Sequence, residues 1–399
     1  MTDAAPLKLK KDQDRRLRAG HCWIYSNEVD IAQTPLKDLA PGQAVDVVSH
    51  RGKWLGSGYV NPNTLICARL VSRDQAHPLD QSLLVHRIKI ALGLREALYP
   101  GPFYRLVFGE ADGLPGLIVD RYDDQLVVQL TTAGMDALRE DVVAALDKVL
   151  KPSVILLRND VASRTTEGLE QVIEVAKGTV PERTTVIEGG ARFEVSLSEG
   201  QKTGWFYDQA ANRDRLMKYV AGKRVLDVCS YVGAWGVRAA LGGAESVTCV
   251  DVSARALEQV EANAALNGVA DKVRIAQGDA FVTLKELRQA GEHFDVIVVD
   301  PPAFIKRKKD IKEGTLAYRR LNEVAMSLLS RDGLLMSASC SFHMDRDALL
   351  HTLQLGARHV DRSLQLLEYG QQGPDHPIHP AIMETAYLKA YYLRVLPTF

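Results

Sequence analysis

The 399-residue sequence predicts an α/β protein whose C-terminal half is a doubly wound parallel sheet, preceded by a β-rich module and a small middle α/β domain. Three patterns lead to this prediction. Apolar and polar residues alternate over 43–73, a helix pattern then precedes hairpin patterns, and from about residue 222 strand-like and helix-like segments alternate regularly. We place the three domains at 1–75, 76–190 and 191–399.

The N-terminal module combines strand patterns with a basic cluster. Gly and Asn-Pro turn signals divide 43–73 into short strands. The basic cluster just before it would be either a solvated arm or a set of contacts to nucleic-acid phosphates. It consists of Lys8, Lys10, Lys11, Arg15, Arg16 and Arg18.

The middle domain begins with a predicted helix over 77–98, where apolar residues recur at three- and four-residue steps. The stretch 103–132 predicts strands separated by the turns "DGLPG" and "YDD". A second helix over about 134–150 and a strand within 153–160 complete this domain, and turn residues mark its end near 190.

The C-terminal domain shows the β–α alternation most clearly. Such alternation implies a parallel sheet with ligands at the carboxyl ends of its strands. We expect strands within 224–230, 246–253, 272–280, 294–302 and 333–341, with helices between them, and the segments 363–370 and 386–396 end the chain.

Composition limits the remaining classes. The chain is 46% hydrophobic, with a net charge of −1 and no apolar stretch long enough to cross a bilayer or direct secretion. Its five cysteines form no C-x-x-C pair, which argues against a disulfide framework or a zinc knuckle. We therefore expect a cytoplasmic protein with no membrane partner and no metal.

Acidic residues end three successive predicted strands. The first strand leads into a turn with Gly233 and Gly236 but without the G-x-G-x-x-G fingerprint, which argues against NAD or FAD. Asp251 would accept the hydroxyls of a ribose, Asp279 the amino group of an adenine, and Asp227 a cationic amino-acid group. This set favours S-adenosylmethionine as the cofactor.

The fourth strand ends in "VVDPPAF", with Asp300 followed by a rigid Pro-Pro loop. An ordinary strand ending would look similar, but in enzymes that methylate bases a loop of this kind flanks the target base, and Phe304 would stack on that base. A basic run follows, suited to the phosphates beside such a base. It comprises Lys306, Arg307, Lys308, Lys309 and Lys312.

Cys340 lies at the tip of the fifth predicted strand, in "GLLMSASCS". A free cysteine is most often a small buried hydrophobe. At this position a thiolate would instead face the crevice and add to C6 of a pyrimidine, which makes C5 nucleophilic. Cys229 is the competing thiol, which the cofactor would cover, and we interpret Cys22, Cys67 and Cys249 as structural.

Two polar segments complete the candidate site. Lys202, Thr203 and Gly204 are interpreted as a flap over the cofactor, with an aromatic core cluster as the alternative interpretation. His376 and His379 have H-x-x-H spacing, but the flanking prolines and the missing third ligand favour a substrate-facing turn over a metal site.

Taken together, these segments resemble the bacterial ribosomal RNA cytosine-5 methyltransferases that carry an N-terminal PUA domain. The similar pieces follow the family's order along nearly the whole chain. The turn "DVCSYVGAWG" departs from the G-x-G-x-G turn common in methyltransferases. The pieces are "GHCWIYSNEV", "GEADGLPGLIVDRY", "EGL" at 167–169, "GQKTGWFYDQ", "DPPAF", "SCS" at 339–341 and "DHPIHPA" with "METAYLK".

The resemblance implies a PUA domain, a small α/β insert and a Rossmann-like class I methyltransferase domain. It also implies large-subunit ribosomal RNA as the partner and Cys340 as the nucleophile. Its cofactor contacts would fall on Lys202, Thr203, Asp227, Tyr231, Gly233, Asp251, Asp279 and Asp300, to which the sequence pattern adds Gly204 and Ala280.

The expected activity is therefore S-adenosylmethionine-dependent methylation at C5 of a cytosine, with Cys340 as nucleophile and Asp300 hydrogen-bonded to the base. One alternative is methylation of another position, such as a guanine nitrogen, for which Cys340 would be dispensable. A second is a non-catalytic RNA-binding or ribosome-assembly factor. The sequence leaves the target nucleotide and the existence of a homodimer open.

Overall fold

The computed structural model describes residues 4–398, which form two compact units. The first unit contains the chain up to Thr184 together with Ser196–Tyr207 and Pro374–Thr385. The second contains Thr185–Val195, Asp208–Gly373 and the residues from Ala386 onward. The sequence pattern did not predict that two short segments of the C-terminal region would join the first unit.

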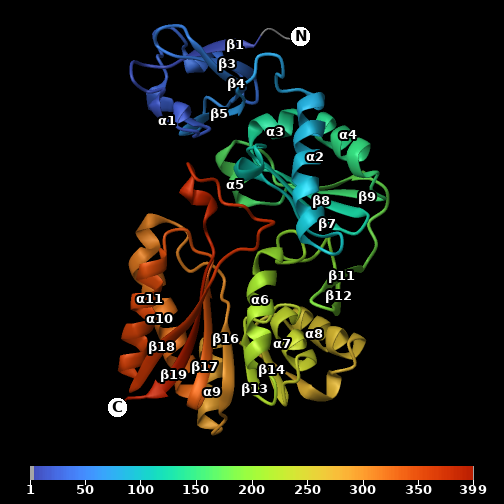
Figure 1. Cartoon of the computed structure of the whole chain (residues 1–399), viewed down its shortest axis with the longest axis vertical. Helices are drawn as coiled ribbons and strands as arrows, with labels where there is room; N and C mark the ends of the chain where they lie inside the picture. Colours follow the sequence, from blue (N-terminus) through green and yellow to red (C-terminus); the bar gives the residue numbers. More distant parts are fainter. Residues whose placement is uncertain (1–3, 399) are drawn as a thin grey trace. The chain divides into compact units, whose positions relative to one another are not determined.

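The N-terminal module of the first unit, drawn in blue in Figure 1, contains a five-stranded sheet in the order β1-β3-β4-β5-β2. Only β1 and β3 pair in parallel. Its core consists of alternate strand residues such as Val45 and Val47, with Leu17 from the short helix α1 (Arg15–Arg18). The strands are β1 (Ala5–Lys8), β2 (Trp23–Tyr25), β3 (Ala44–Val48), β4 (Trp54–Val60) and β5 (Ile66–Ser72).

The middle part of the first unit is a second five-stranded sheet, in the order β10-β9-β8-β7-β6. Residue Leu138 separates two helices where the sequence predicted one. The long helix α2 begins where the Asp80 carboxylate accepts the Leu83 amide, and it packs on the core of this sheet. The strands are β6 (Phe103–Phe108), β7 (Leu117–Tyr122), β8 (Gln125–Leu130), β9 (Val154–Arg158) and β10 (Ile173–Lys177); the helices are α2 (Gln81–Leu98), α3 (Ala133–Ala137), α4 (Arg139–Leu150) and α5 (Ala162–Thr166).

The second unit is built on a seven-stranded sheet in the order β15-β14-β13-β16-β17-β19-β18. The first five strands are parallel, whereas β19 runs antiparallel to β17 and to β18. The strands are β13 (Arg224–Val228), β14 (Ser246–Asp251), β15 (Val273–Gln277), β16 (Phe294–Val299), β17 (Leu329–Ser339), β18 (Arg362–Gly370) and β19 (Lys389–Pro397), and a separate hairpin joins β11 (Thr184–Glu188) to β12 (Ala191–Val195). The predicted doubly wound α/β fold is confirmed.

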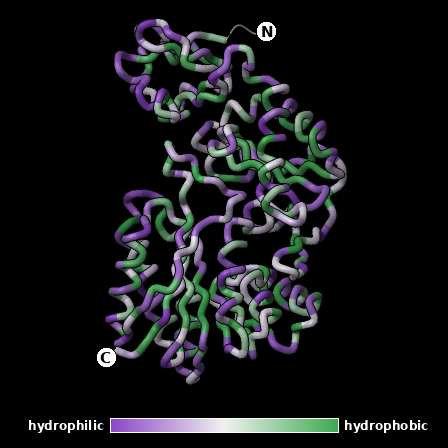
Figure 2. The backbone as a smooth tube through the Cα atoms, in the orientation of Figure 1, coloured by the Kyte–Doolittle hydropathy of each residue, from purple (hydrophilic) through white to green (hydrophobic). Residues whose placement is uncertain are grey.

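Helices cover this sheet, and the order of its strands determines where a ligand can bind. Parallel strands that are buried on both faces carry nearly continuous apolar side chains, and most of these strands are coloured hydrophobic in Figure 2. Strand β13 pairs in parallel with β14 on one side and with β16 on the other. After β13 the chain adds β14 and β15 on one side of it and then β16 and β17 on the other, so the order of strand addition reverses at β13. Ligands bind at such a switch point, at the carboxyl ends of the strands. The helices are α6 (Ala210–Leu216), α7 (Ala234–Leu241), α8 (Ala254–Leu266), α9 (Ala280–Gln289), α10 (Ile311–Leu328) and α11 (Arg346–His359).

Candidate active site

The turn after β13 has a backbone that most side chains disfavour. Cys229, Tyr231 and Gly233 all have positive φ, at 65°, 50° and 85°. Each non-glycine residue in this region costs about 1–3 kcal/mol, and such turns cluster at functional sites. Gly236 is required for a different reason, because a Cβ there would lie 2.5 Å from the Cys249 sulfur. The turn and the close approach of α7 bring backbone groups to the edge of the sheet.

Asp227 lies fully buried within β13, one residue before the strand ends. Its Oδ2 accepts the Gly236 amide at 2.9 Å, whereas its Oδ1 has no hydrogen-bond partner among the described residues. Burial, together with the carboxylates of Asp300 and Asp251, raises the pKa of this carboxyl to about 8. Because buried polar atoms are rarely left unpaired, Oδ1 fits a donor group of a ligand.

The other two predicted strand-end acids differ from Asp227. Asp251 is the last residue of β14, and its two oxygens accept the Tyr231 and Ser253 amides, each at 2.9 Å. Asp279 lies beyond β15 and is exposed; its Oδ1 accepts the first amides of α9 and so caps that helix. Asp279 thus lies two residues beyond the last residue of β15, and its predicted adenine contact stays a prediction. Ala280 is the first residue of α9.

Asp300 directly follows β16 and is oriented by two side chains that the sequence analysis did not single out. Its Oδ1 accepts Gln209 Nε2 at 2.9 Å, and its Oδ2 accepts Trp235 Nε1 at 3.0 Å. Burial raises its pKa to about 6, with Asp208 contributing in the same direction. A carboxyl with this pKa can hold or release a proton near neutrality.

Cys340 directly follows β17 and is partly exposed. Its neighbours in sequence, Ser339 and Ser341, are both buried. Ser339 Oγ donates to the Tyr318 hydroxyl at 2.9 Å, and that hydroxyl pairs with Ser341 Oγ at 2.9 Å. Ser341 Oγ also accepts the Ile305 amide at 3.1 Å. The backbone on either side of the thiol is therefore fixed.

A lysine in β19 completes this corner of the site. Lys389 is 5% exposed, and its Nζ donates to the carbonyls of Ser341 at 2.6 Å and Tyr387 at 2.8 Å. Burial lowers its pKa to about 8, and Cys340 opposes that change. In the sequence, Lys389 is a lone lysine within the apolar run "YLKAYYL", and it was not predicted as part of the site.

The remaining cysteines occupy less reactive environments. Burial and the surrounding carboxylates, of which Asp251 has the largest effect, together raise the pKa of Cys229 to about 12. Burial likewise raises the pKa of Cys22 and Cys67 to about 12 and that of Cys249 well above its usual value. Their burial agrees with the structural interpretation.

The loop after β16 carries the predicted base-stacking residue and the basic run. The half-buried Phe304 ring has its centroid 4.8 Å from that of Tyr318 and 6.3 Å from that of Phe281. All the basic side chains of the run are exposed, and Arg307 contacts Asp310 at 3.4 Å. Contacts of this loop with a base or phosphates stay predictions.

In the N-terminal basic cluster, Arg16 differs from its neighbours. It is half-buried and donates to both oxygens of Glu28, at 2.8 and 2.9 Å, and Glu28 also accepts the Tyr25 amide. Arg16 therefore helps to hold the module together, and its predicted phosphate contact stays a prediction. The other members, Lys8, Lys10, Lys11, Arg15 and Arg18, are exposed or partly exposed and stay predicted RNA contacts.

The predicted flap lies in the first unit. Lys202 has a φ of 51°, and its ammonium lies 4.9 Å from the centre of the Phe206 ring. Thr203 is buried, and its carbonyl accepts the Tyr122 hydroxyl at 3.0 Å. Gly204 has a φ of 110°. The acids lie in the second unit, so a joint cofactor site stays a prediction.

The H-x-x-H segment is not the predicted substrate-facing turn at its first histidine. His376 is 2% exposed, pairs with the Asp375 carboxylate at 2.9 Å and packs its ring on Phe108. Asp375 also accepts the Arg105 amide. This histidine therefore belongs to the core of the first unit.

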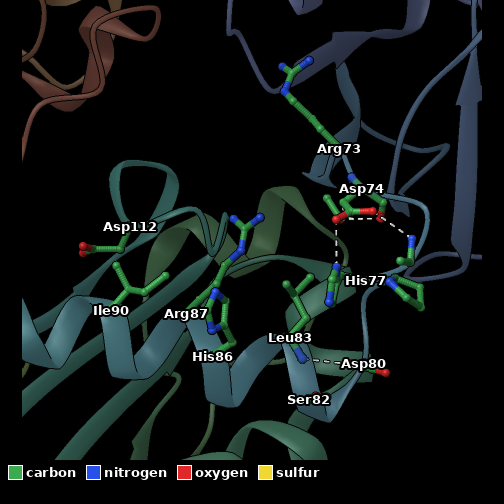
Figure 3. Close-up of a pocket in the computed structure, with 13 residues that line it drawn as sticks. Arg73, Asp74, His77, Asp80, Ser82, Leu83, His86, Arg87, Ile90 and Asp112 are labelled. Carbon is green, nitrogen blue, oxygen red and sulfur yellow. Dashed lines mark hydrogen bonds and ion pairs between the residues drawn. The ribbon is translucent and has the colours of Figure 1, made fainter.

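A pocket of about 740 Å³ lies in the first unit between the end of β5 and α2 (Figure 3). None of the predicted site residues lines it. The lining includes the basic side chain of Arg73, the imidazole of His86 and the carboxylates of Asp74 and Asp112. The Arg87 guanidinium donates to two backbone carbonyls. This mixed lining does not favour one class of ligand.

Within residues 4–398, no helix is long and apolar enough to span a bilayer.

Family models match two parts of the chain. Residues 7–73 match the PUA-like domain family, and residues 167–394 match the S-adenosylmethionine-dependent methyltransferase family. A protein of Shewanella denitrificans named ribosomal RNA large subunit methyltransferase I is 37% identical over 98% of this chain and 100% of its own length. The protein of the same name from Aliivibrio fischeri is 36% identical over 97% of this chain and 98% of its own.

Two solved structures share the fold. A Streptococcus mutans protein described as an S-adenosylmethionine-dependent methyltransferase superimposes with a TM-score of 0.82 at 22% identity, covering 98% of this chain and 100% of that chain. A methyltransferase complexed with SAH superimposes with a TM-score of 0.83 at 23% identity, with the same coverage.

Proposed function

The chain belongs to the S-adenosylmethionine-dependent methyltransferases, in the family of the ribosomal RNA large subunit methyltransferases I, and we propose that it methylates C5 of a cytosine in large-subunit ribosomal RNA through a thiolate of Cys340. The observation that supports this proposal most is the partly exposed Cys340 at the end of a parallel strand, between two buried and hydrogen-bonded serines.

The residues at the sheet edge fit the cofactor. Asp227 offers a buried oxygen with no partner, suited to the ammonium of an amino-acid group. Asp251 would bind the ribose, and the start of α9 at Asp279 and Ala280 would receive the adenine. When bound, the cofactor supplies an electrophilic methyl group on a sulfonium. The proposed set also includes Tyr231, Gly233 and Asp300, with Lys202, Thr203 and Gly204 as its flap.

The chemistry requires a nucleophile because C5 of cytosine is unreactive. The Cys340 thiolate adds to C6 of the base, so that a C–S bond forms and electron density moves to C5. C5 then accepts the methyl group. Removal of the C5 proton by a base restores the double bond, and the C–S bond breaks to release the thiolate. Each turnover yields one 5-methylcytosine and one proton, and the thiolate is unchanged.

Asp300 would hold the base during these steps. Its carboxylate oxygens already accept Gln209 and Trp235, and each oxygen can accept a second hydrogen bond, here from the amino group of the cytosine. Its pKa of about 6 also suits it to proton transfer at C5. The PUA-like domain and the exposed run from Lys306 to Lys312 would contact RNA phosphates.

Nucleoside mass spectrometry of ribosomal RNA tests the proposal. Cells that lack the protein should lose one 5-methylcytidine, which the native chain and Cys229→Ala restore but Cys340→Ala does not. Loss of a different methylated base would move the activity to another position, such as a guanine nitrogen. Unchanged methylation of every base would favour the non-catalytic alternative.

A further inference from the structure

We propose that Lys389 is a positioning residue that activates Cys340 by placing a buried ammonium beside its thiolate. The inference rests on the proposed function, in which Cys340 is the nucleophile, and it concerns how that thiol becomes reactive.

The sheet register brings Lys389 to this position. In the antiparallel pair of β17 and β19, Lys389 lies opposite Ser339, the residue before Cys340. Its Nζ then donates to the carbonyl of Ser341, the residue after Cys340, at 2.6 Å. The lysine therefore bridges the backbone around the thiol. An ammonium has three N–H donors, and the bonds to Ser341 and Tyr387 use two of them.

The charge of Lys389 has no carboxylate partner within ion-pair distance among the described residues. Burial of an unpaired charge is costly, so buried charges normally face an opposite charge. The groups that influence Lys389 are Cys340 after β17 and, at the start of α11, Asp345 and Arg346. Cys340 favours the charged form more than Asp345 does, and Arg346 opposes it. A thiolate at Cys340 is thus the anion that best compensates this ammonium.

Tyr318 of α10 is a further titratable group at this corner. Burial raises its pKa, so it stays neutral while it links Ser339 and Ser341. Tyr318 therefore fixes the backbone around the thiol without adding charge. Lys389 fixes this backbone and also adds a positive charge. This division allows positioning and electrostatic effects to be separated by mutation.

The proposed role affects two steps of the reaction. The thiol proton passes to solvent, and the ammonium stabilises the remaining thiolate before it attacks C6. The same ammonium stabilises the thiolate again when the C–S bond breaks. No proton is transferred from Lys389 in either step.

The test is the pH dependence of Cys340 alkylation by iodoacetamide in the full-length protein, followed by peptide mass spectrometry. Lys389→Gln keeps donors for the two carbonyls but removes the charge. We expect it to move the midpoint of the pH–rate profile up by about one unit and to slow alkylation at neutral pH about tenfold. Lys389→Arg should retain most of the native rate. Tyr318→Phe should leave the midpoint within a few tenths of a unit, as should Lys218→Met at an exposed lysine.

A folded Lys389→Gln variant with the native profile would overturn the inference. If this variant does not fold, the native protein decides, because its midpoint should lie below that of an ordinary thiol, about 8.5; a native midpoint at or above that value also overturns the inference. The failure of this inference can be distinguished from the failure of the proposed function. Methylation by Cys340→Ala would refute thiolate catalysis, whereas alkylation that ignores Lys389 would refute only the role of the lysine.

Discussion

Two cysteines of the second unit, Cys229 and Cys340, occupy similar positions in the fold but different electrostatic environments. Each directly follows a parallel strand, β13 or β17, and each is partly exposed. Cys229 faces carboxylates that, with burial, raise its pKa to about 12. Beside Cys340, the Lys389 ammonium instead donates to the carbonyl of Ser341. Both thiols therefore share a position at the ligand-binding edge, and the proposed function distinguishes them by the charged groups around each.

The largest difference should appear in catalysis. Cys340→Ala removes the proposed nucleophile and is expected to lower methyl transfer to large-subunit ribosomal RNA more than about a thousandfold. Cys229→Ala should stay within a few-fold of native, because that thiol remains protonated. Transfer of a radiolabelled methyl group to RNA measures both. Equal losses in the two variants would remove the distinction between the cysteines.

The carboxylates around Cys229 should affect the stability of the protein, and Asp227 should have a measurable effect on the free energy of unfolding. The pKa of Asp227 is raised to about 8 in the folded state, above its ordinary value near 4, so its contribution to stability decreases as pH rises through this range. Asp227→Asn keeps an acceptor for Gly236 and removes the charge. The free energy of unfolding of this variant should exceed that of the native chain by about 2–4 kcal/mol above pH 8, with no gain near pH 4. Urea unfolding at several pH values measures this difference, which a pH-independent gap would contradict.

Asp300 should set the acid limb of the activity profile. Its carboxylate must be ionised to accept the amino group of the base, so kcat/KM should fall as pH decreases through about 6. The Trp235 hydrogen bond favours the ionised form. Trp235→Phe should therefore move the acid limb to higher pH by about half a unit. A limb that stays in place would mean that another group controls it.

The smallest effect concerns the reactivity of Cys229. Asp251 is the carboxylate that raises its pKa most, so Asp251→Asn should accelerate alkylation of Cys229 about two- to threefold at alkaline pH. Alkylation of Cys340 in the same sample serves as the control and should not change. If both rates increase together, the variant has loosened the fold rather than altered one thiol.

The sheet of the second unit could be predicted because its pattern is local. Strands such as Arg224–Val228 and Phe294–Val299 are continuous apolar runs separated by helical segments, and parallel order follows from that alternation. Asp227, Asp251 and Asp300 could likewise be predicted, because each lies at or near the end of such a run.

The remaining features depend on contacts between residues far apart in sequence. Lys389 and Tyr318 meet the segment around Cys340 only after β19 and α10 have packed. The burial of His376 follows from contacts between Asp375 and the middle sheet, including the amide of Arg105 at 3.0 Å. No local pattern of apolar residues carries this information, so these side chains were missed or misinterpreted.

The most direct test of thiolate catalysis is covalent trapping on RNA that contains 5-fluorocytidine. Fluorine at C5 cannot leave as a proton does, so the C–S bond formed by Cys340 should persist after the methyl group is added. With S-adenosylmethionine present, the native chain and Cys229→Ala should form a denaturant-stable complex with the RNA, and peptide mapping should place the bond at Cys340. A Cys340→Ala variant that still forms the complex, or a native chain that methylates cytosine without forming it, would contradict the account.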